Sequence, residues 1–179
     1  MASSTREKIL AVSLRLFNEQ GYRNVTMRAI ADALSISVGN LTYHFAKKQD
    51  IVAALMDDVF AQMTATADMP AASLAQIDSL FSMMLDTLER CAFFFLDNEL
   101  KQENGPLHLA HHTHLRARLI DGLNALAEQG FFIESFTPEV CRTLIQILLM
   151  SHMTWLKQTV RGTDKNAMSK TEFLRAHWL

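Results

Sequence analysis

The sequence predicts an all-α protein with an N-terminal helix-turn-helix unit of three helices and a larger helical body. Apolar residues recur at helical spacing along most of the 179 residues, and no strand-like alternation stands out. Turn-forming residues divide the chain into segments of helix length. Near the N-terminus, only three residues, Ser35 to Ser37, separate two short helical segments. That separation is the turn length of a helix-turn-helix.

The first helix is expected over residues 5–20. Gly21 follows its last residue and is a favourable C-terminal stop. Ile9, Leu16 and Phe17 fall on one broad apolar face, whereas Lys8 lies off it. We expect this face to pack against the two short helices that follow.

The two short helices share the same start signals. Thr26 and Ser37 are hydroxyl-bearing caps. Each cap follows an apolar residue, and another apolar residue stands at the fourth helical position, which is the hydrophobic staple arrangement. The staple pairs are Val25 with Ile30, and Ile36 with Leu41.

Longer helices are expected in the rest of the chain. The clearest start is Thr137 as cap with Pro138 at the first helical position. We divide the chain into an N-terminal domain of residues 1–48 and a body of residues 49–179. The expected helices after the N-terminal domain cover about residues 47–66, 73–98, 107–129, 137–161 and 167–178.

The second short helix, residues 38–45, has two different sides. Leu41 and Phe45 fall together at 3.6 residues per turn and are expected to face the core. The opposite side is small, polar or aromatic. It carries Gly39, Asn40, Thr42 and Tyr43.

This outward side suits DNA, because the second helix of a helix-turn-helix enters the major groove. Gly39 allows the backbone to approach closely, and Asn40 and Thr42 can contact base edges. Phosphate contacts position such a helix without reading sequence. The candidates for phosphate contacts are Ser37, Tyr43 and His44.

Two adjacent lysines, Lys47 and Lys48, support the same interpretation. They stand at the start of the next helix, where each cation interacts unfavourably with the helix dipole, at a cost of about 0.3–1 kcal/mol. A DNA phosphate bound at that helix start would interact favourably with both lysines and with the free backbone N–H groups. Residues 1–50 contain seven basic and four acidic residues, for a net charge of +3. The rest of the chain contains ten basic and 15 acidic residues, for a net charge of −5. A polyanion is therefore expected to meet the first part of the chain.

The N-terminal domain resembles that of the TetR family of bacterial transcriptional regulators. The resemblance rests on F-x-x-x-G-Y-x-x-V-T-M-x-x-I-A from Phe17 to Ala31 and on S-V-G-N-L-T-Y-H-F-A-K-K from Ser37 to Lys48. Thr42 departs from the pattern, because a tyrosine is usual there. The resemblance implies DNA contacts at Thr26, Arg28, Ser37, Gly39, Thr42, Tyr43, His44 and Lys48.

The resemblance also implies a helical body that dimerises and binds a small molecule. Residues 140–156 independently favour a dimer, because apolar side chains surround almost the whole helix. The expected interface residues are Leu144, Leu148, Phe173 and Trp178. A ligand pocket is expected from Met83, Met84, Phe93, Phe94, Phe95 and Trp155, with plain core packing as the alternative for each.

Other functional classes have weaker support. No apolar run spans a bilayer, and two cysteines, Cys91 and Cys141, fit a reduced cytoplasmic protein. We find no catalytic constellation and expect no enzyme activity, cofactor or metal. A metal protein using the cluster His108, His111, His112 and His114 is one alternative, and a regulator without a ligand is another. The expected function is a homodimeric repressor that a small molecule releases from a quasi-palindromic double-stranded DNA operator.

Overall fold

The computed structural model describes residues 4–67, 73–103, 105–131, 137–160 and 168–176, and every regular element in these ranges is a helix. Within them, the side chains of residues 66, 67, 74, 105–109, 111, 112 and 160 lie outside the description. None of the described helices is long and apolar enough to cross a membrane.

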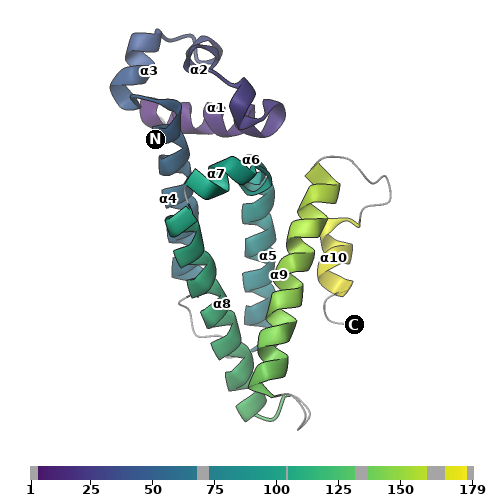
Figure 1. The fold of residues 1–179 in the computed structure, drawn as a ribbon. Helices are drawn as coiled ribbons and strands as arrows, with labels where there is room; N and C mark the ends of the chain where they lie inside the picture. Colours follow the sequence, from purple (N-terminus) through teal and green to yellow (C-terminus); the bar gives the residue numbers. More distant parts are fainter. Residues whose placement is uncertain (1–3, 68–72, 104, 132–136, 161–167, 177–179) are drawn as a thin grey trace.

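The N-terminal domain forms one end of the molecule (Figure 1). It contains α1 (Thr5–Gln20), a short 3-10 helix η1 (Tyr22–Asn24), α2 (Met27–Ala33) and α3 (Val38–His44). Gly21 ends α1 with φ of 80° and donates its N–H to the Phe17 carbonyl. The predicted bounds of α1 are therefore confirmed.

Hydroxyl caps begin both short helices, as predicted. Thr26 Oγ1 accepts from the Ala29 N–H at 3.1 Å, and Ser37 Oγ accepts from the Asn40 N–H at 3.1 Å. Each cap satisfies one backbone donor that the first helical turn leaves without a partner. The staple residues Val25, Ile30 and Leu41 are buried, and Ile36 is half-buried.

The turn between α2 and α3 is closed by two backbone hydrogen bonds. The Ile36 N–H donates to the Ala31 carbonyl at 3.0 Å, and the Ser35 N–H donates to the Asp32 carbonyl at 3.1 Å. This pairing is the Schellman motif. It places Ser35 at φ of 54°, the left-handed region in which glycine is usual.

The body is built on four long helices, whose arrangement can be followed in Figure 1. α4 (Lys48–Ala67) runs out of the N-terminal domain and packs beside α8 (Gly105–Glu128), and α5 (Leu74–Arg90) and α9 (Pro138–Val160) complete the set. The short helices α6 (Ala92–Leu96) and α7 (Asn98–Glu103) lie beneath α1. A last helix, α10 (Lys170–Ala176), packs against α5.

One predicted helix is wrong, because residues 73–98 do not form a single helix. The helix breaks at Cys91, whose φ and ψ are −114° and 34°. Asn18 of α1 stabilises the break: its side-chain N–H donates to the Arg90 carbonyl at 2.8 Å, and its Oδ1 accepts from the Phe93 N–H at 3.0 Å. A side chain from another element therefore satisfies groups that a continuous helix would have paired.

The C-terminal helix also starts later than expected. Residues 168 and 169 are not helical, and α10 begins at Lys170. Ser169 and Glu172 form a reciprocal cap, in which each side chain accepts from the other residue's N–H. Trp178 lies outside the described residues.

Candidate nucleic-acid interface and body cavity

The outward side of α3 is exposed to solvent. Leu41 and Phe45 are buried beneath it, whereas the Tyr43 side chain is 85% exposed. Gly39, Asn40 and Thr42 are also exposed. The predicted division of this helix into a core side and a surface side is confirmed.

Local hydrogen bonds define what α3 can offer to a partner. The Thr42 hydroxyl donates to the Gly39 carbonyl at 3.1 Å, which leaves its methyl group and oxygen lone pairs available. A Cβ added at Gly39 would meet only Ser37 Oγ, at 3.8 Å. The fold itself therefore leaves room for a side chain at Gly39, which fits a glycine kept for close approach of a partner.

The neighbouring candidates on α2 and at the end of α3 are exposed or half-exposed. Thr26 and Arg28, at the start of α2, are exposed, and Arg28 lies 3.8 Å from Asp32 in an exposed pair. The His44 ring lies 5.3 Å from the Tyr43 ring in edge geometry. The Tyr43 hydroxyl and the His44 ring nitrogens are polar atoms that can contact a phosphate.

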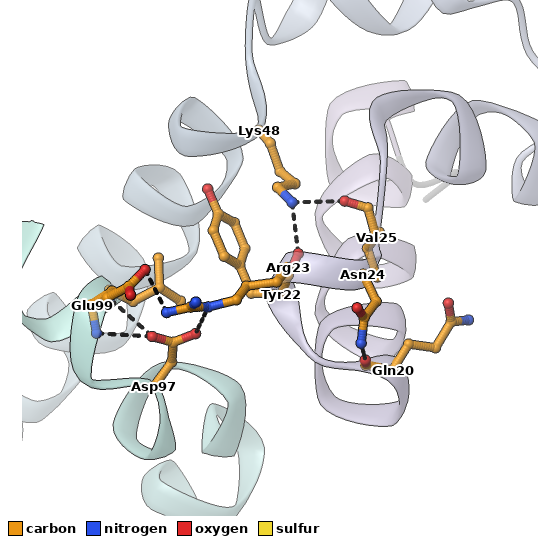
Figure 2. Close-up of polar contacts among 9 residues, drawn as sticks. Gln20, Tyr22, Arg23, Asn24, Val25, Lys48, Asp97 and Glu99 are labelled. Carbon is orange, nitrogen blue, oxygen red and sulfur yellow. Dashed lines mark hydrogen bonds and ion pairs between the residues drawn. The ribbon is translucent and has the colours of Figure 1, made fainter.

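The structure separates the two lysines. Lys48 Nζ donates to the Tyr22 carbonyl at 2.6 Å and to the Val25 carbonyl at 2.7 Å, and it lies 4.0 Å from the Tyr22 ring centroid (Figure 2). Burial lowers the pKa of Lys48. The Lys47 side chain is exposed, and its backbone N–H donates to Asp50 Oδ2 at 3.1 Å. Two of the three Lys48 donors thus hold the chain between α1 and α2.

The body contains a cavity of about 210 Å³ whose wall is formed by residues of α4, α5, α6, α7, α8 and α9. Two predicted pocket residues, Met84 and Phe95, line it. The described lining is otherwise apolar except for Lys101 and His152. A mostly apolar concavity with a few polar groups is typical of a small-molecule site.

The other predicted pocket residues pack elsewhere. Phe93 contacts Phe17 of α1, with ring centroids 5.2 Å apart, and Phe94 contacts Phe60 at 6.3 Å. Trp155 stacks on Phe173 and donates its ring N–H to the Met168 carbonyl. Met83 is half-buried and is not among the residues that line the cavity. The break at Cys91 turns successive aromatic residues towards different neighbours.

Comparison with known proteins agrees with this geometry. The family profile for bacterial regulatory proteins of the tetR family matches residues 9–55, which include α2, the turn and α3. The transcriptional repressor KstR2 of Mycobacterium tuberculosis is 28% identical over 165 residues, covering 87% of this chain and 82% of that protein. A TetR-family regulator from Marinobacter aquaeolei VT8 superimposes with a TM-score of 0.76 at 25% identity over 98% of both chains. The helix-turn-helix region of this chain, residues 9–55, belongs to the TetR family.

A further relative is similar to part of the chain. The transcriptional regulator CymR of Pseudomonas putida is 29% identical over 98 residues, covering 55% of this chain and 47% of that protein. These relatives are transcriptional regulators and not enzymes. The expected class of protein, a helix-turn-helix transcriptional regulator, is confirmed.

One side of α9 carries an exposed apolar row. Val140, Ile147 and Met150 are 45%, 58% and 63% exposed. Leu144 and Leu148, predicted for the dimer interface, are half-buried beside this row. Phe173 instead packs within the same chain against His152 and Trp155.

Sequence reasoning missed the residues that join the two domains. Arg23 of η1 donates to Asp97 Oδ2 at 3.5 Å and pairs with Glu99 at the start of α7 (Figure 2). Burial acts to raise the pKa of Asp97, but the N–H groups of Leu100 and Glu99 and the Arg23 guanidinium outweigh it and lower that pKa. Asp97 is also the N-terminal cap of α7, so an Asp-Asn-Glu sequence before a short helix was the available signal.

The histidine cluster falls largely outside the description. His108, His111 and His112 lie on the backbone of α8, but their side chains are not described. In the part of the chain that the structure describes, no group of three His, Cys, Asp or Glu side chains could hold a metal ion.

Proposed function

We propose that this TetR-family protein is a cytoplasmic, dimeric repressor that binds a quasi-palindromic operator and leaves it when a small molecule occupies the body cavity. The observation that carries the proposal is the exposed side of α3, held on two capped and stapled helices. We assign residues 1–48 to DNA binding and residues 49–179 to dimerisation and ligand binding.

We assign base recognition to two side chains of α3. The exposed Asn40 amide can form a bidentate contact with an adenine. Thr42 offers its methyl group to a thymine, because its hydroxyl proton is directed at the Gly39 carbonyl. Gly39 lets the helix approach the bases.

Phosphate contacts surround this reading surface and set its orientation. We assign them to exposed or half-exposed groups on both short helices and at the start of α4. These residues are Thr26, Arg28, Ser37, Tyr43, His44 and Lys47. We assign Lys48 mainly to holding the α1–α2 connection and the start of α4 in register, with one ammonium donor left for a phosphate.

A second subunit is expected to cover the apolar row of α9. Val140, Ile147 and Met150 form a stripe at spacings of seven and three residues, which is one side of a helix. A two-fold axis through this stripe would present two α3 helices to half-sites about one helical turn, or a multiple of it, apart.

Ligand response requires a connection between the cavity and α3. The α6–α7 segment provides one, because Phe95 lines the cavity while Phe93 packs on Phe17 and Asp97 holds Arg23. A ligand releases DNA only if it binds one dimer arrangement more tightly than the other. The favoured arrangement must be the one in which the spacing of the two α3 helices does not match the half-sites.

Selection of bound DNA from a random library tests the proposal. We expect enrichment of a two-fold-related pair of half-sites, and we expect Asn40→Ala to relax base preference at one position in each half-site. Asn98→Ala, an exposed change of the same chemistry on α7, serves as the control and should return the parental site. Failure to enrich any sequence, or an enriched site without two-fold symmetry, would contradict the proposal.

A further inference from the structure

We infer that the body cavity takes an apolar ligand that carries a single negative charge, typically a carboxylate, and that Lys101 holds this charge. The inference rests on the proposed function, because it names the class of ligand at the proposed regulatory site. It begins from Lys101, the one lysine, arginine or carboxylate side chain among the described residues of the cavity wall.

The rest of the wall indicates an apolar ligand body. Phe60, Leu88, Leu115 and Leu149 contribute rigid apolar surface. Three methionines add adaptable surface, which suits a ligand of irregular outline. They are Met63, Met84 and Met153.

The cavity volume sets the size of that apolar body. An apolar cavity of roughly 150 Å³ accommodates benzene. The cavity here, at about 210 Å³, therefore holds a substituted single ring or a chain of medium length. A large multi-ring ligand would require the walls to move apart.

Lys101 decides the charge of the ligand. Its side chain is half-buried, and among the described residues no carboxylate pairs with its ammonium. Burial and the positive charge of Lys157 both lower the pKa of Lys101, and Asp97 partly opposes them. A cation in apolar surroundings is costly unless it is paired.

Each class of ligand has a different consequence at this ammonium. A carboxylate would supply a charge-assisted hydrogen bond to Lys101. An uncharged ligand could at most accept a hydrogen bond and would bury the ammonium further without a compensating negative charge, and an amine would add repulsion. The wall therefore selects an anion over a neutral or cationic compound with the same apolar body.

His152 is a fixed part of the wall and gives the ligand a defined boundary. Its Nδ1 faces the Leu148 carbonyl, which can only accept, so this nitrogen is the donor. The ring lies stacked 5.4 Å from Phe81 and edge-on 5.3 Å from Phe173. These contacts hold the His152 ring in place. Lys101 is therefore the polar group of the wall whose side chain can adjust to a ligand.

The position of Lys101 also places the ligand's charge near the domain joint. Lys101 stands on α7, one helical turn after Asp97, and its backbone N–H donates to the Asp97 carbonyl. Asp97 holds Arg23 of the N-terminal domain. An anion on Lys101 therefore acts on the same short helix that contacts the DNA-binding unit.

Titration calorimetry with the full-length protein and three probes tests this inference. The probes are 4-butylbenzoate, 4-butylbenzyl alcohol and 4-butylbenzylamine, which share one apolar body. We expect the carboxylate to bind about tenfold or more tightly than the alcohol, because only the carboxylate pairs an opposite charge with the ammonium, and the amine to bind most weakly.

Three variants assign the preference to one ammonium. Lys101→Met should abolish the preference for the carboxylate over the alcohol, whereas Lys101→Arg should retain it. Lys157→Met, which removes a nearby exposed cation that does not line the cavity, should change the preference less than threefold. Thermal unfolding of each variant shows that it is folded.

The outcomes separate this inference from the proposed function. Equal binding of carboxylate and alcohol, an unchanged preference in Lys101→Met, or no binding of any probe overturns the inference and leaves the DNA selection result untouched. Failure of the DNA selection overturns the proposed function, while a carboxylate preference lost in Lys101→Met would still establish the anion site.

Discussion

Lys47 and Lys48 are adjacent in sequence and differ in structure. Lys47 reaches into solvent from the start of α4, whereas Lys48 turns back to bind the Tyr22 and Val25 carbonyls. The same residue type therefore serves two purposes within one helical turn. We expect Lys47 to act on DNA and Lys48 to act mainly on the fold of the N-terminal domain.

Substitution of each lysine by methionine should separate these roles. Lys48→Met removes two hydrogen bonds from a charged donor and should lower the free energy of unfolding by about 1.5 kcal/mol, the low end for charged groups, because the side chain is only partly buried. Lys47→Met should change the free energy of unfolding by less than about 0.5 kcal/mol.

The DNA-binding measurement completes this comparison. Lys47→Met should weaken binding to all sequences and reduce the slope of log affinity against log salt by about 1. Urea unfolding and binding titrations at several salt concentrations provide the two readouts. Equal loss of stability in both variants would show that the lysines do not divide their roles in this way.

Among the elements, the turn from α2 to α3 offers the clearest test. Ser35 has φ of 54°, and an L-residue in this region costs about 1–2 kcal/mol, which glycine avoids. Glycine also has more conformational freedom in the unfolded chain, and losing it on folding cancels about 0.5–1 kcal/mol of this stabilisation. Ser35→Gly should therefore raise the free energy of unfolding by roughly 0.5–1 kcal/mol.

Ser35→Ala is the matched control, because it removes the same hydroxyl and keeps the Cβ. It should fail to stabilise the protein in the same urea unfolding experiment. If Ser35→Gly were no more stable than Ser35→Ala, backbone strain at this turn would not be the relevant quantity.

The elements also show which structural features the sequence could predict. The bounds of α1 and the starts of α2 and α3 depend on local residues such as Gly21, Thr26 and Ser37, and these predictions were confirmed. The break at Cys91 depends on Asn18, which is 72 residues from Arg90 in sequence. No local pattern contains that information.

The candidate sites show the same difference between features set by local sequence and features set by distant residues. Helical periodicity correctly placed the exposed side of α3, because one helix and its core determine it. The cavity wall is formed by residues of six helices, so residue composition identified Met84 and Phe95 but not Lys101 or His152. The direction of each aromatic residue in α6 depends on the break that precedes it.

At the scale of the whole molecule, Asp97 joins the two domains and makes their contact sensitive to acid. The pKa of Asp97 is lowered in the folded protein, so its stabilising contribution is present above the unfolded value of about 3.9. This contribution is lost as pH falls through the lower folded pKa.

Asp97→Asn should therefore be less stable than the parent protein at pH 6, and the difference should shrink as pH falls below about 4. Urea unfolding at pH 6 and pH 3 measures both differences. Glu19→Gln removes a carboxylate from an exposed pair with Arg15 and should show little difference at either pH. A difference for Asp97→Asn that stays constant across this range would contradict the assignment.

The Asn18 contact has a consequence for how the chain folds. One amide of α1 completes hydrogen bonds on both sides of the α5–α6 break, so neither part has its final structure until the other is in place. Assignment of separate functions to residues 1–48 and 49–179 therefore does not make them separate folding units. Amide protons around Phe93 and within α1 should exchange with solvent through one shared opening event, as members of a single cooperative unit.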